Sequence, residues 1–435
     1  MLLIYLPKFS SRCNYVFDFI FKEELGIDYR TTSDAIEFQN YSAEKLNYSN
    51  SIFSNEWFIK AASLLFENEI KKQEIKIGNK NGTPVLFPNE DVLGFDIFAA
   101  VFYLVSRYEE YLPFVPDEYG RYRAANSFAS QNDFLHLPVV NIWINLFKNI
   151  LQGKFPSIKI KPHVFNAIVT YDIDVAYKYS GRNLGRTTGA IFKDILALNF
   201  KELNARIEVL LKRKNDPWDV YEDLEKIILE NKLQSIFFFL LSDKSRHDRN
   251  LSYQNNAIKK LVNKIERFSE IGIHPSFYST DQPEKIVIEK ERLEKIVSKK
   301  IYKSRQHYLR FILPDTYNSL LAAGITEDYS MGFAGMPGFR AGTCKPFYFY
   351  DLKSEKRTPL KVFPVTFMEG TFIEKSILNP EESLEKMLSL LDEVKKVEGN
   401  FISIWHNHTI SKTPEYTLWK NVHEKMIEKL CELLR

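Results

Sequence analysis

Residues 167–174 read Ala-Ile-Val-Thr-Tyr-Asp-Ile-Asp, an apolar and β-branched run that ends in two carboxylates one residue apart. Such a run is typical of a buried parallel strand, and the carboxyl ends of these strands usually carry the chemistry of α/β folds. Asp172 and Asp174 are therefore expected at the open edge of a sheet, where two acids suit a metal ion and a proton transfer. An Asp pair after a strand is also commonly a helix N-cap and a turn residue, so the rest of the chain must decide between these two interpretations.

Composition limits the class of protein. A chain of 435 residues is longer than one ordinary core requires, so two domains are expected. The hydrophobic content of 45% and the charged content of 26% suit a soluble globular protein. The net charge is only +3, and the basic residues are interleaved with acids. This pattern argues against a nucleic-acid partner.

The cysteines and the N-terminus bear on the compartment. Cys13, Cys344 and Cys431 are far apart and form no CxxC pair, which predicts neither a disulfide framework nor a structural zinc site. The apolar N-terminal residues lack the basic region and cleavage site of an export signal, and no window reaches the roughly 18 apolar residues of a membrane span. We therefore expect a cytoplasmic protein without a membrane span.

The first part of the chain is expected to form a smaller N-terminal α+β domain, over residues 1–155. It has a strand-like run at 2–6 and helical patterns at 94–109 and 138–152. The stretch 153–163 is interpreted as a linker.

From residue 164 to residue 435, apolar strand patterns alternate with amphipathic helix patterns. The predicted strands are 165–171, 234–241, 270–274, 305–311, 361–368 and 400–405, and the predicted helices are 217–231, 254–268, 284–300, 315–323 and 380–398. This alternation predicts right-handed βα units and a parallel sheet, arranged either as a barrel or as a doubly wound layer.

Histidines gather at the ends of these predicted strands. His274 ends one predicted strand, His406 and His408 both follow another, and Arg305 and His307 belong to a third. Any one of these histidines could be an ordinary core or surface residue, but several of them beside two acids favour a metal site with open positions. The metal would activate water and polarise a carbonyl, an Asp would act as base, and a His would protonate the leaving group. The pattern favours amide or ester hydrolysis.

The same segments, in the same order, resemble the polysaccharide deacetylases of the NodB-homology, or carbohydrate esterase 4, type. TYDID at 170–174 is similar to the first family motif, IGIHPSFYS at 271–279 to the second, SRQHY at 304–308 to the third and ISIWHN at 402–407 to the last. The resemblance covers residues 164–434 and implies a distorted parallel (β/α) barrel. The segments EDYSMGF, GFRAGT and SRYEEYLPF further resemble a bacterial branch of this family with an extra N-terminal domain.

The resemblance also implies roles for individual residues. It makes Asp172 the catalytic base, Arg305 the residue that orients this base, and His406 the general acid. Asp174 and His274 would be metal ligands. The implied cofactor is a divalent metal, with zinc first and cobalt or nickel as alternatives, and the implied substrate is an acetylated sugar of a bacterial polysaccharide or its precursor.

Several positions depart from the family pattern. Tyr278 stands where the second motif has another histidine, and His307 is the candidate that replaces it as a metal ligand. Asp328 is the nearest candidate for the acid of the family's fourth motif. Arg340 lies in a glycine-flanked loop, where it would bind a substrate carboxylate or phosphate or serve as a structural arginine. Tyr278 and Asn407 are further candidates for substrate binding.

Three functions therefore stay open. The first is metal-dependent removal of acetyl groups from N- or O-acetylated sugars. The second is a catalytically inactive deacetylase-like barrel that binds glycan or scaffolds polysaccharide biosynthesis, which the missing histidine favours. The third is a metal-free hydrolase that uses Asp172 and His406 alone.

Overall fold

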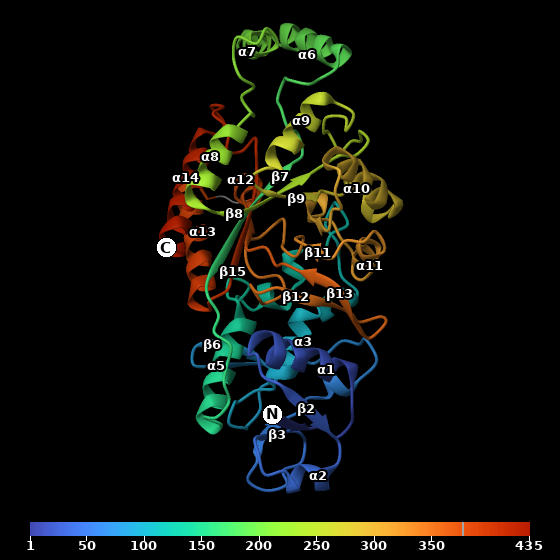
Figure 1. Cartoon of the computed structure of the whole chain (residues 1–435), viewed down its shortest axis with the longest axis vertical. Helices are drawn as coiled ribbons and strands as arrows, with labels where there is room; N and C mark the ends of the chain where they lie inside the picture. The colour runs from blue at the N-terminus through green and yellow to red at the C-terminus, as the bar shows by residue number, and fades with distance from the viewer. Residues whose placement is uncertain (376–377) are drawn as a thin grey trace.

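The N-terminal part contains a small parallel sheet. The computed structural model describes residues 1–375 and 378–435, and its first four strands pair in the order β2-β1-β3-β4 (Figure 1, blue). These strands are β1 (Leu2–Tyr5), β2 (Tyr29–Thr32), β3 (Lys45–Ser49) and β4 (Trp57–Lys60). An antiparallel hairpin of β5 (Ile77–Lys80) and β6 (Thr83–Leu86) follows them.

The α-helices of this part are α1 (Ser11–Phe17), which a π-helix over Asp18–Glu24 continues, α2 (Ala35–Asn40), α3 (Ile97–Val105), α4 (Phe128–Gln131) and α5 (Val139–Lys154). Every residue of α3 is buried, as expected for a helix that is apolar on all sides. The helix predicted over 94–109 ends earlier than expected, because Arg107 has a left-handed φ of 55° that interrupts the helical backbone.

The second part is built on a nine-stranded sheet with the order β12-β13-β11-β10-β9-β8-β7-β15-β14. Its pairs are parallel except for the antiparallel pair of β12 and β13. The strands are β7 (Asn166–Ile173), β8 (Gln234–Phe239), β9 (Glu270–Ile273), β10 (Lys303–Ser304), β11 (Glu327–Asp328), β12 (Phe347–Asp351), β13 (Lys356–Val362), β14 (Phe367–Met368) and β15 (Asn400–His406). In the part of the chain that the structure describes, no ladder joins β14 to β12, so the expected closure of a barrel is not shown.

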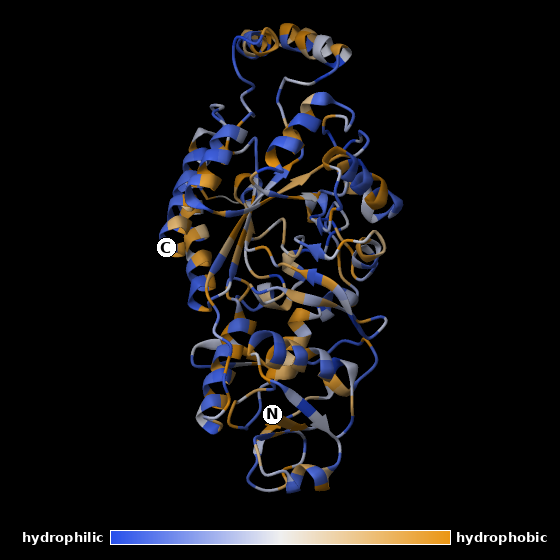
Figure 2. Ribbon diagram, in the orientation of Figure 1, coloured by the Kyte–Doolittle hydropathy of each residue, from blue (hydrophilic) through white to orange (hydrophobic). Residues whose placement is uncertain are grey.

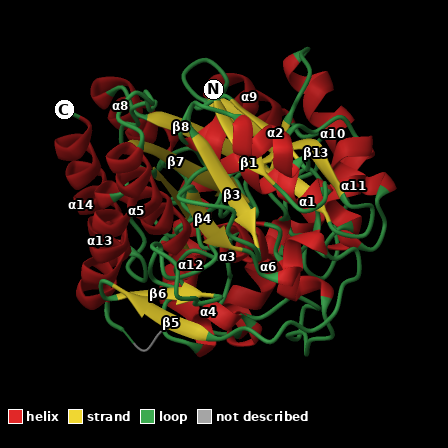
Figure 3. Cartoon of the chain, turned by 90° about the horizontal axis from the view of Figure 1, so that it is seen from below, coloured by secondary structure: helices red, strands yellow, loops and turns green. Residues whose placement is uncertain are grey.

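Helices cover the outer side of this sheet (Figure 3). They are α8 (Tyr221–Asn231), α9 (Asn256–Ile265), α10 (Glu284–Val297), α11 (Asp315–Ala322), α13 (Pro380–Lys396) and α14 (Thr417–Leu434), whereas the short α12 (Glu369–Glu374) directly follows β14. The start of α13 is fixed by a capping box between Asn379 and Glu382, with Pro380 in the first turn.

Alternation along β7 separates two cores. Val169, Tyr171 and Ile173 belong to the large core, which continues into the N-terminal part, whereas Ile168 belongs to a smaller core on the opposite face. Residues of β8, β15 and the segments after β11 and β13 complete this smaller core. The sheet is therefore curved around a short apolar interior, and Asp172 lies on the same inner face, four residues beyond Ile168.

Two strand predictions are wrong. No residue of the predicted strand 305–311 belongs to a strand, because the short β10 ends at Ser304 and the chain then turns over His307–Leu309, where Tyr308 has a left-handed φ of 62°. The predicted strand 361–368 is divided between β13 and β14 by Pro364, which has no N–H to donate to a ladder.

A helical hairpin between β7 and α8 was not predicted. It consists of α6 (Leu184–Leu196) and α7 (Phe200–Leu210), and it stands apart from the rest of the molecule at the top of Figure 1. Among the described residues, no helix combines the length and apolar character needed to cross a bilayer.

Candidate active site and metal centre

A buried ion pair holds Asp172 in a defined orientation. The side chain of Arg305, which follows β10, is completely buried, and its Nη1 donates to Oδ1 of Asp172 at 2.8 Å and to Oγ1 of Thr170 at 2.7 Å. Its Nε donates to the backbone oxygen of Tyr329 at 2.9 Å. Thr170 and Asp172 lie on one face of β7 because they are two residues apart. One carboxylate oxygen of Asp172 is therefore fixed, and the other lies 3.7 Å from Nε2 of His274.

Three imidazoles converge on the second acid, Asp174. The Nε2 atom of His274 lies 3.3 Å from Oδ1, while the Nε2 atoms of His307 and His406 lie 3.5 Å and 3.6 Å from Oδ2. These side chains come from the ends of β7, β9 and β15 and from the turn after β10. Neither acid caps a helix, since the next helix begins after Asn183, so the N-cap alternative does not hold.

Each imidazole has a separate partner for its other nitrogen. Nδ1–H of His274 donates to the backbone oxygen of Arg305 at 2.6 Å. Nδ1 of His307 contacts Asp248 at 2.9 Å, and Nδ1 of His406 contacts Glu369 at 2.7 Å. Such partners fix the ring orientation and direct Nε2 toward the centre of the site, which is the usual arrangement behind metal-binding histidines.

The charges in this cluster depend strongly on one another. Burial opposes ionisation of Asp174, but the neighbouring His307, His274 and His406 hold its pKa well below the usual range. Burial likewise opposes protonation of His307, but Asp174 and Asp248 raise its pKa to about 9. For His406, the carboxylate of Glu369 outweighs burial and raises the pKa to about 10. Three acids thus make these two imidazoles strong bases.

The donor set fits a divalent metal ion. The ligand atoms of Asp174, His274 and His307 all lie within 4.8 Å of one another, and the buried Oδ1 of Asp174 has no hydrogen-bond partner among the described residues. Bonds of about 2.0–2.1 Å in a tetrahedral zinc site separate two ligand atoms by roughly 3.3–3.4 Å. The 3.3 Å and 3.5 Å contacts of Asp174 are close to this separation, whereas they are long for hydrogen bonds.

The cluster lies at the base of a pocket of about 490 Å³. Asp172, Asp174, His274, His307 and His406 all line it. Its aromatic lining residues are Tyr119, Trp218, Tyr308 and Tyr416, and its basic ones are Arg121, Arg246, Arg249 and Lys375. The pocket therefore combines a polar base with aromatic and cationic walls.

The three residues expected to bind substrate lie elsewhere, and none of them is among the described residues that line this pocket. Arg340 is 2% exposed and donates from two nitrogens to Glu110, at 2.6 Å and 2.9 Å, and from Nη1 to a backbone oxygen. The ring of Tyr278 lies beside those of His247 and Phe277. Asn407 is buried and donates to three backbone oxygens of neighbouring loops. The structure thus gives each of the three residues contacts within the protein, and their roles in substrate binding stay predictions.

Asp248 and Glu369 were not recognised from the sequence. Glu369 directly follows the predicted strand 361–368, as Asp172 follows 165–171, and this position was the available signal; Asp248 lies seven residues after the predicted strand 234–241 and gave no such signal. Asp328, which was considered for the missing family acid, instead accepts from Ser304 and Ser330 between β10 and β11. The acid that contacts Nδ1 of His406 is Glu369.

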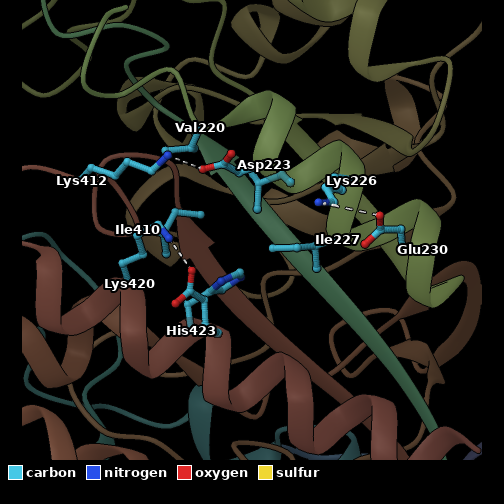
Figure 4. Close-up of a pocket in the computed structure, with 11 residues that line it drawn as sticks. Val220, Asp223, Lys226, Ile227, Glu230, Ile410, Lys412, Lys420 and His423 are labelled. Atoms are coloured by element: carbon cyan, nitrogen blue, oxygen red, sulfur yellow. Dashed lines mark hydrogen bonds and ion pairs between the residues drawn. The ribbon is translucent and has the colours of Figure 1, made fainter.

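A second pocket of about 450 Å³ lies between α8 and α14 (Figure 4). Its charged side chains pair with one another, for example Lys412 with Asp223 at 3.0 Å and Lys226 with Glu230 at 4.0 Å. Nε2 of its histidine, His423, lies 3.0 Å from the hydroxyl of Tyr171, and burial lowers the pKa of His423 to about 3. This pocket has no convergent set of acids and imidazoles among the described residues.

Comparison with known proteins gave a family match for the first part of the chain only. A family model described as a family of unknown function (DUF7033) matches residues 2–156, which is less than half of the chain. Comparison with curated proteins gave no match.

Several solved structures are similar to this chain. A putative polysaccharide deacetylase from Mycobacterium smegmatis is 13% identical, with 61% of this chain and 86% of that chain covered and a TM-score of 0.40. A polysaccharide deacetylase from Bacillus cereus is 11% identical, with 62% and 89% covered and a TM-score of 0.31. A CE4 family pseudoenzyme from Bacillus anthracis is 9% identical, with 61% and 63% covered and a TM-score of 0.29. Likenesses this distant do not bear on activity, which has to be inferred from the site itself.

Proposed function

We propose that this protein is a metal-dependent hydrolase that removes acetyl groups from N- or O-acetylated sugars of a bacterial polysaccharide or its precursor. The observation that carries the proposal is the convergence of three imidazoles on Asp174, beside an Asp172 that is held by Arg305. The order of the sequence motifs supports it. A NodB-type barrel over residues 164–435, a separate domain over residues 1–155 and a cytoplasmic location are parts of the same proposal.

Asp174, His274 and His307 would hold the metal ion. Zinc is proposed because one carboxylate and two imidazoles are common zinc ligands, and cobalt or nickel suits the same donors. When bound, the ion would polarise the acetyl carbonyl and lower the pKa of a coordinated water. His307 takes the place of the histidine that Tyr278 replaces in the family motif.

Asp172 is proposed as the general base. Arg305 occupies Oδ1, so Oδ2 is left to accept a proton from the attacking water. The water oxygen forms a bond to the acetyl carbon as its proton moves to Asp172. Arg305 acts as a positioning residue, since it contacts the base and not the pocket.

His406 is proposed as the general acid. Its Nδ1 is held by Glu369, and its Nε2 faces the pocket near Asp174. As the bond from the acetyl carbon to the sugar nitrogen or oxygen breaks, His406 gives its proton to that atom. The products are acetate and a free amino or hydroxyl group on the sugar. The high pKa of His406 keeps this proton available at neutral pH.

Sugars suit the aromatic lining of the pocket. The rings of Trp218 and Tyr416 both lie beside His408, and those of Tyr119 and Tyr308 lie beside each other. Aromatic side chains with polar tips offer both an apolar face and a hydrogen-bonding group to a pyranose.

Acetate release and bound metal test the proposal together. Purified protein would be incubated with chitopentaose and with acetylated xylan, and its metal content measured by mass spectrometry. We expect one zinc ion per chain and acetate release that is lost with a chelator and in Asp172→Asn. Asp243→Asn is a matched control, because this carboxylate is exposed and pairs with Arg292. A metal-free protein whose acetate release survives Asp172→Asn would refute the proposal.

The catalytically inactive, glycan-binding barrel is the second candidate. Tyr278 at the position of a family metal ligand favours it. It predicts that sugar binding continues without turnover and is unaffected by a chelator or by Asp172→Asn. The presence of His307 beside Asp174 and His274 weighs for the enzyme, because an inactive barrel has no need of a third ligand.

A further inference from the structure

The hairpin of α6 and α7 carries an unusual share of the exposed apolar surface. Nine of the 25 exposed large hydrophobic residues among the described part of the chain fall within residues 184–211. They are Leu184, Phe192, Ile195, Leu196, Leu198, Phe200, Ile207, Leu210 and Leu211, and their exposure ranges from 37% to 84%. Isolated exposed hydrophobics are common, but a gathering of this size marks an interaction surface.

Helical spacing places these side chains on one face of each helix. In α6, Phe192, Ile195 and Leu196 recur at intervals of three and four, and in α7, Phe200 and Ile207 are two turns apart. Figure 2 shows the orange apolar residues mixed with polar ones along the hairpin, clear of the body of the molecule. The rest of the described chain therefore does not cover these apolar faces.

Polar contacts hold the opposite sides of the two helices together. Nε of Arg206 in α7 donates to Asp194 of α6 at 2.9 Å, and both side chains are largely buried. Arg206 also lies over the ring of Tyr179, 4.8 Å from its centroid, and Lys178 pairs with Glu202 at 3.2 Å. Charged contacts thus hold the hairpin together on its inner side, and its outer side is apolar. A helix pair that buries its own core has the opposite arrangement, with apolar residues inside and charged residues outside.

The hairpin is also basic. Residues 182–214 contain eight basic and three acidic residues, a net charge of +5, whereas the whole chain carries +3. All three acids are engaged in ion pairs, Asp194 with Arg206, Glu202 with Lys178 and Glu208 with Arg213. The remaining cations include Lys193, Lys201, Lys212 and Lys214, and those four lysines are exposed.

We propose that the hairpin docks on an anionic lipid bilayer surface. An interfacial helix pair of this kind presents Phe and Leu to the acyl boundary and Lys and Arg to the phosphate headgroups. Charge complementarity favours this occupant over a second copy of the chain, since two hairpins of charge +5 repel each other. The peripheral docking proposed here involves no membrane span.

This placement bears on the pocket, and here the inference rests on the proposed function. The two segments that lead to and from the hairpin contribute Val175 and Trp218 to the pocket lining. A docked hairpin would therefore hold the pocket near the lipid surface. The substrate class that suits this arrangement is an acetylated sugar attached to a membrane lipid.

Vesicle binding by the full chain tests the docking. Vesicles of phosphatidylcholine with phosphatidylglycerol are expected to sediment the protein, and vesicles of phosphatidylcholine alone to sediment far less. Phe192→Ser combined with Phe200→Ser is expected to weaken binding roughly a hundredfold or more, from the burial of two aromatic side chains. Lys212→Gln combined with Lys214→Gln is expected to weaken it about thirtyfold, at about 1 kcal/mol per basic residue near the surface.

Ile36→Ser combined with Leu418→Ser is the matched control, because these residues are 72% and 62% exposed outside the hairpin. Equal loss of binding in this control, or no binding of the wild type to anionic vesicles, would overturn the proposal. A dimer that hairpin variants dissociate, without vesicle binding, would assign the surface to a second copy. Acetate release from a soluble substrate is expected to be unchanged in all these variants, which separates a failure of docking from a failure of the proposed function.

Discussion

Asp248 offers a test of the metal site that alters no proposed ligand. Its Oδ1 accepts from Nδ1 of His307 and from the backbone N of Phe277, both at 2.9 Å, and its Oδ2 accepts from Ser245 at 2.7 Å. Asp248→Asn keeps the size of the side chain and one oxygen but removes the negative charge. His307 would then be less basic and less firmly oriented toward Asp174.

The expected loss of zinc affinity follows from the role of a side chain that holds a metal-binding histidine in place. Removing the hydrogen-bond partner of a metal-binding histidine typically lowers metal affinity 10- to 100-fold, which is about 1.4–2.7 kcal/mol of binding free energy. We expect the upper part of this range, because Asp248 is 1% exposed and its charge is weakly screened. His307→Ala, which removes the ligand itself, should lose more than Asp248→Asn.

Calorimetric titration with zinc against a competing chelator measures this difference. Asp243→Asn is the control in the same loop, because its exposed carboxylate pairs with Arg292 outside the site. It should bind zinc as the wild type does, and thermal unfolding should show all variants folded. Wild-type zinc affinity in both Asp248→Asn and His307→Ala would refute the assignment of His307 as the third ligand.

Three further outcomes are expected. Zinc affinity should rise with pH toward about 9. His307, whose pKa is raised to about 9 in the absence of metal, must lose a proton before it can bind zinc. Zinc titrations across this pH range check the expected rise. Glu369→Gln should move the alkaline limb of the pH profile of acetate release to lower pH. The variant loses the carboxylate that raises the pKa of His406, so His406 loses its proton at a lower pH. A pH–rate profile measures the shift. Arg340→Leu should lower the unfolding free energy by about 1–3 kcal/mol, because Oε2 of the buried Glu110 loses its partner while Oε1 stays paired with Arg107; denaturant unfolding should show a smaller loss when Glu110→Leu is added.

The central strands could be predicted because they are apolar throughout. The runs at 165–171, 234–241 and 400–405 correspond to β7, β8 and β15, which lie side by side and are buried. Burial on both faces produces a continuous apolar run, and the change to Asp or His marks the strand end. For this reason Asp172, Asp174, His274 and His406 could be placed at one edge of the sheet from sequence alone.

The remaining parts depend on long-range contacts that leave a weak local signal. Asp248 lies in a polar loop, where an acid is ordinary until the fold brings it to His307, 59 residues later. Arg340 stood in a glycine-flanked loop that suggested a ligand, but its partner Glu110 is 230 residues away. The two hairpin helices were missed because their apolar faces are broken by charged residues and lie outside the pattern of alternating strands.

The exchange of Tyr278 for a histidine at position 307 is physically reasonable because β9 and β10 are neighbours. Ser304 pairs with Ile273, and the backbone N of His307 donates to the oxygen of Pro275 at 3.0 Å. The turn after β10 therefore lies directly beside the loop after β9, and the rings of His274 and His307 are 5.0 Å apart. If His307 is the third ligand, as we propose, the adjacent strand end supplies the imidazole that the resembled motif places four residues after His274, and the centre of the site does not move. The proposed ligand set then depends on position in space, and the spacing of histidines within one motif is only one way to reach it.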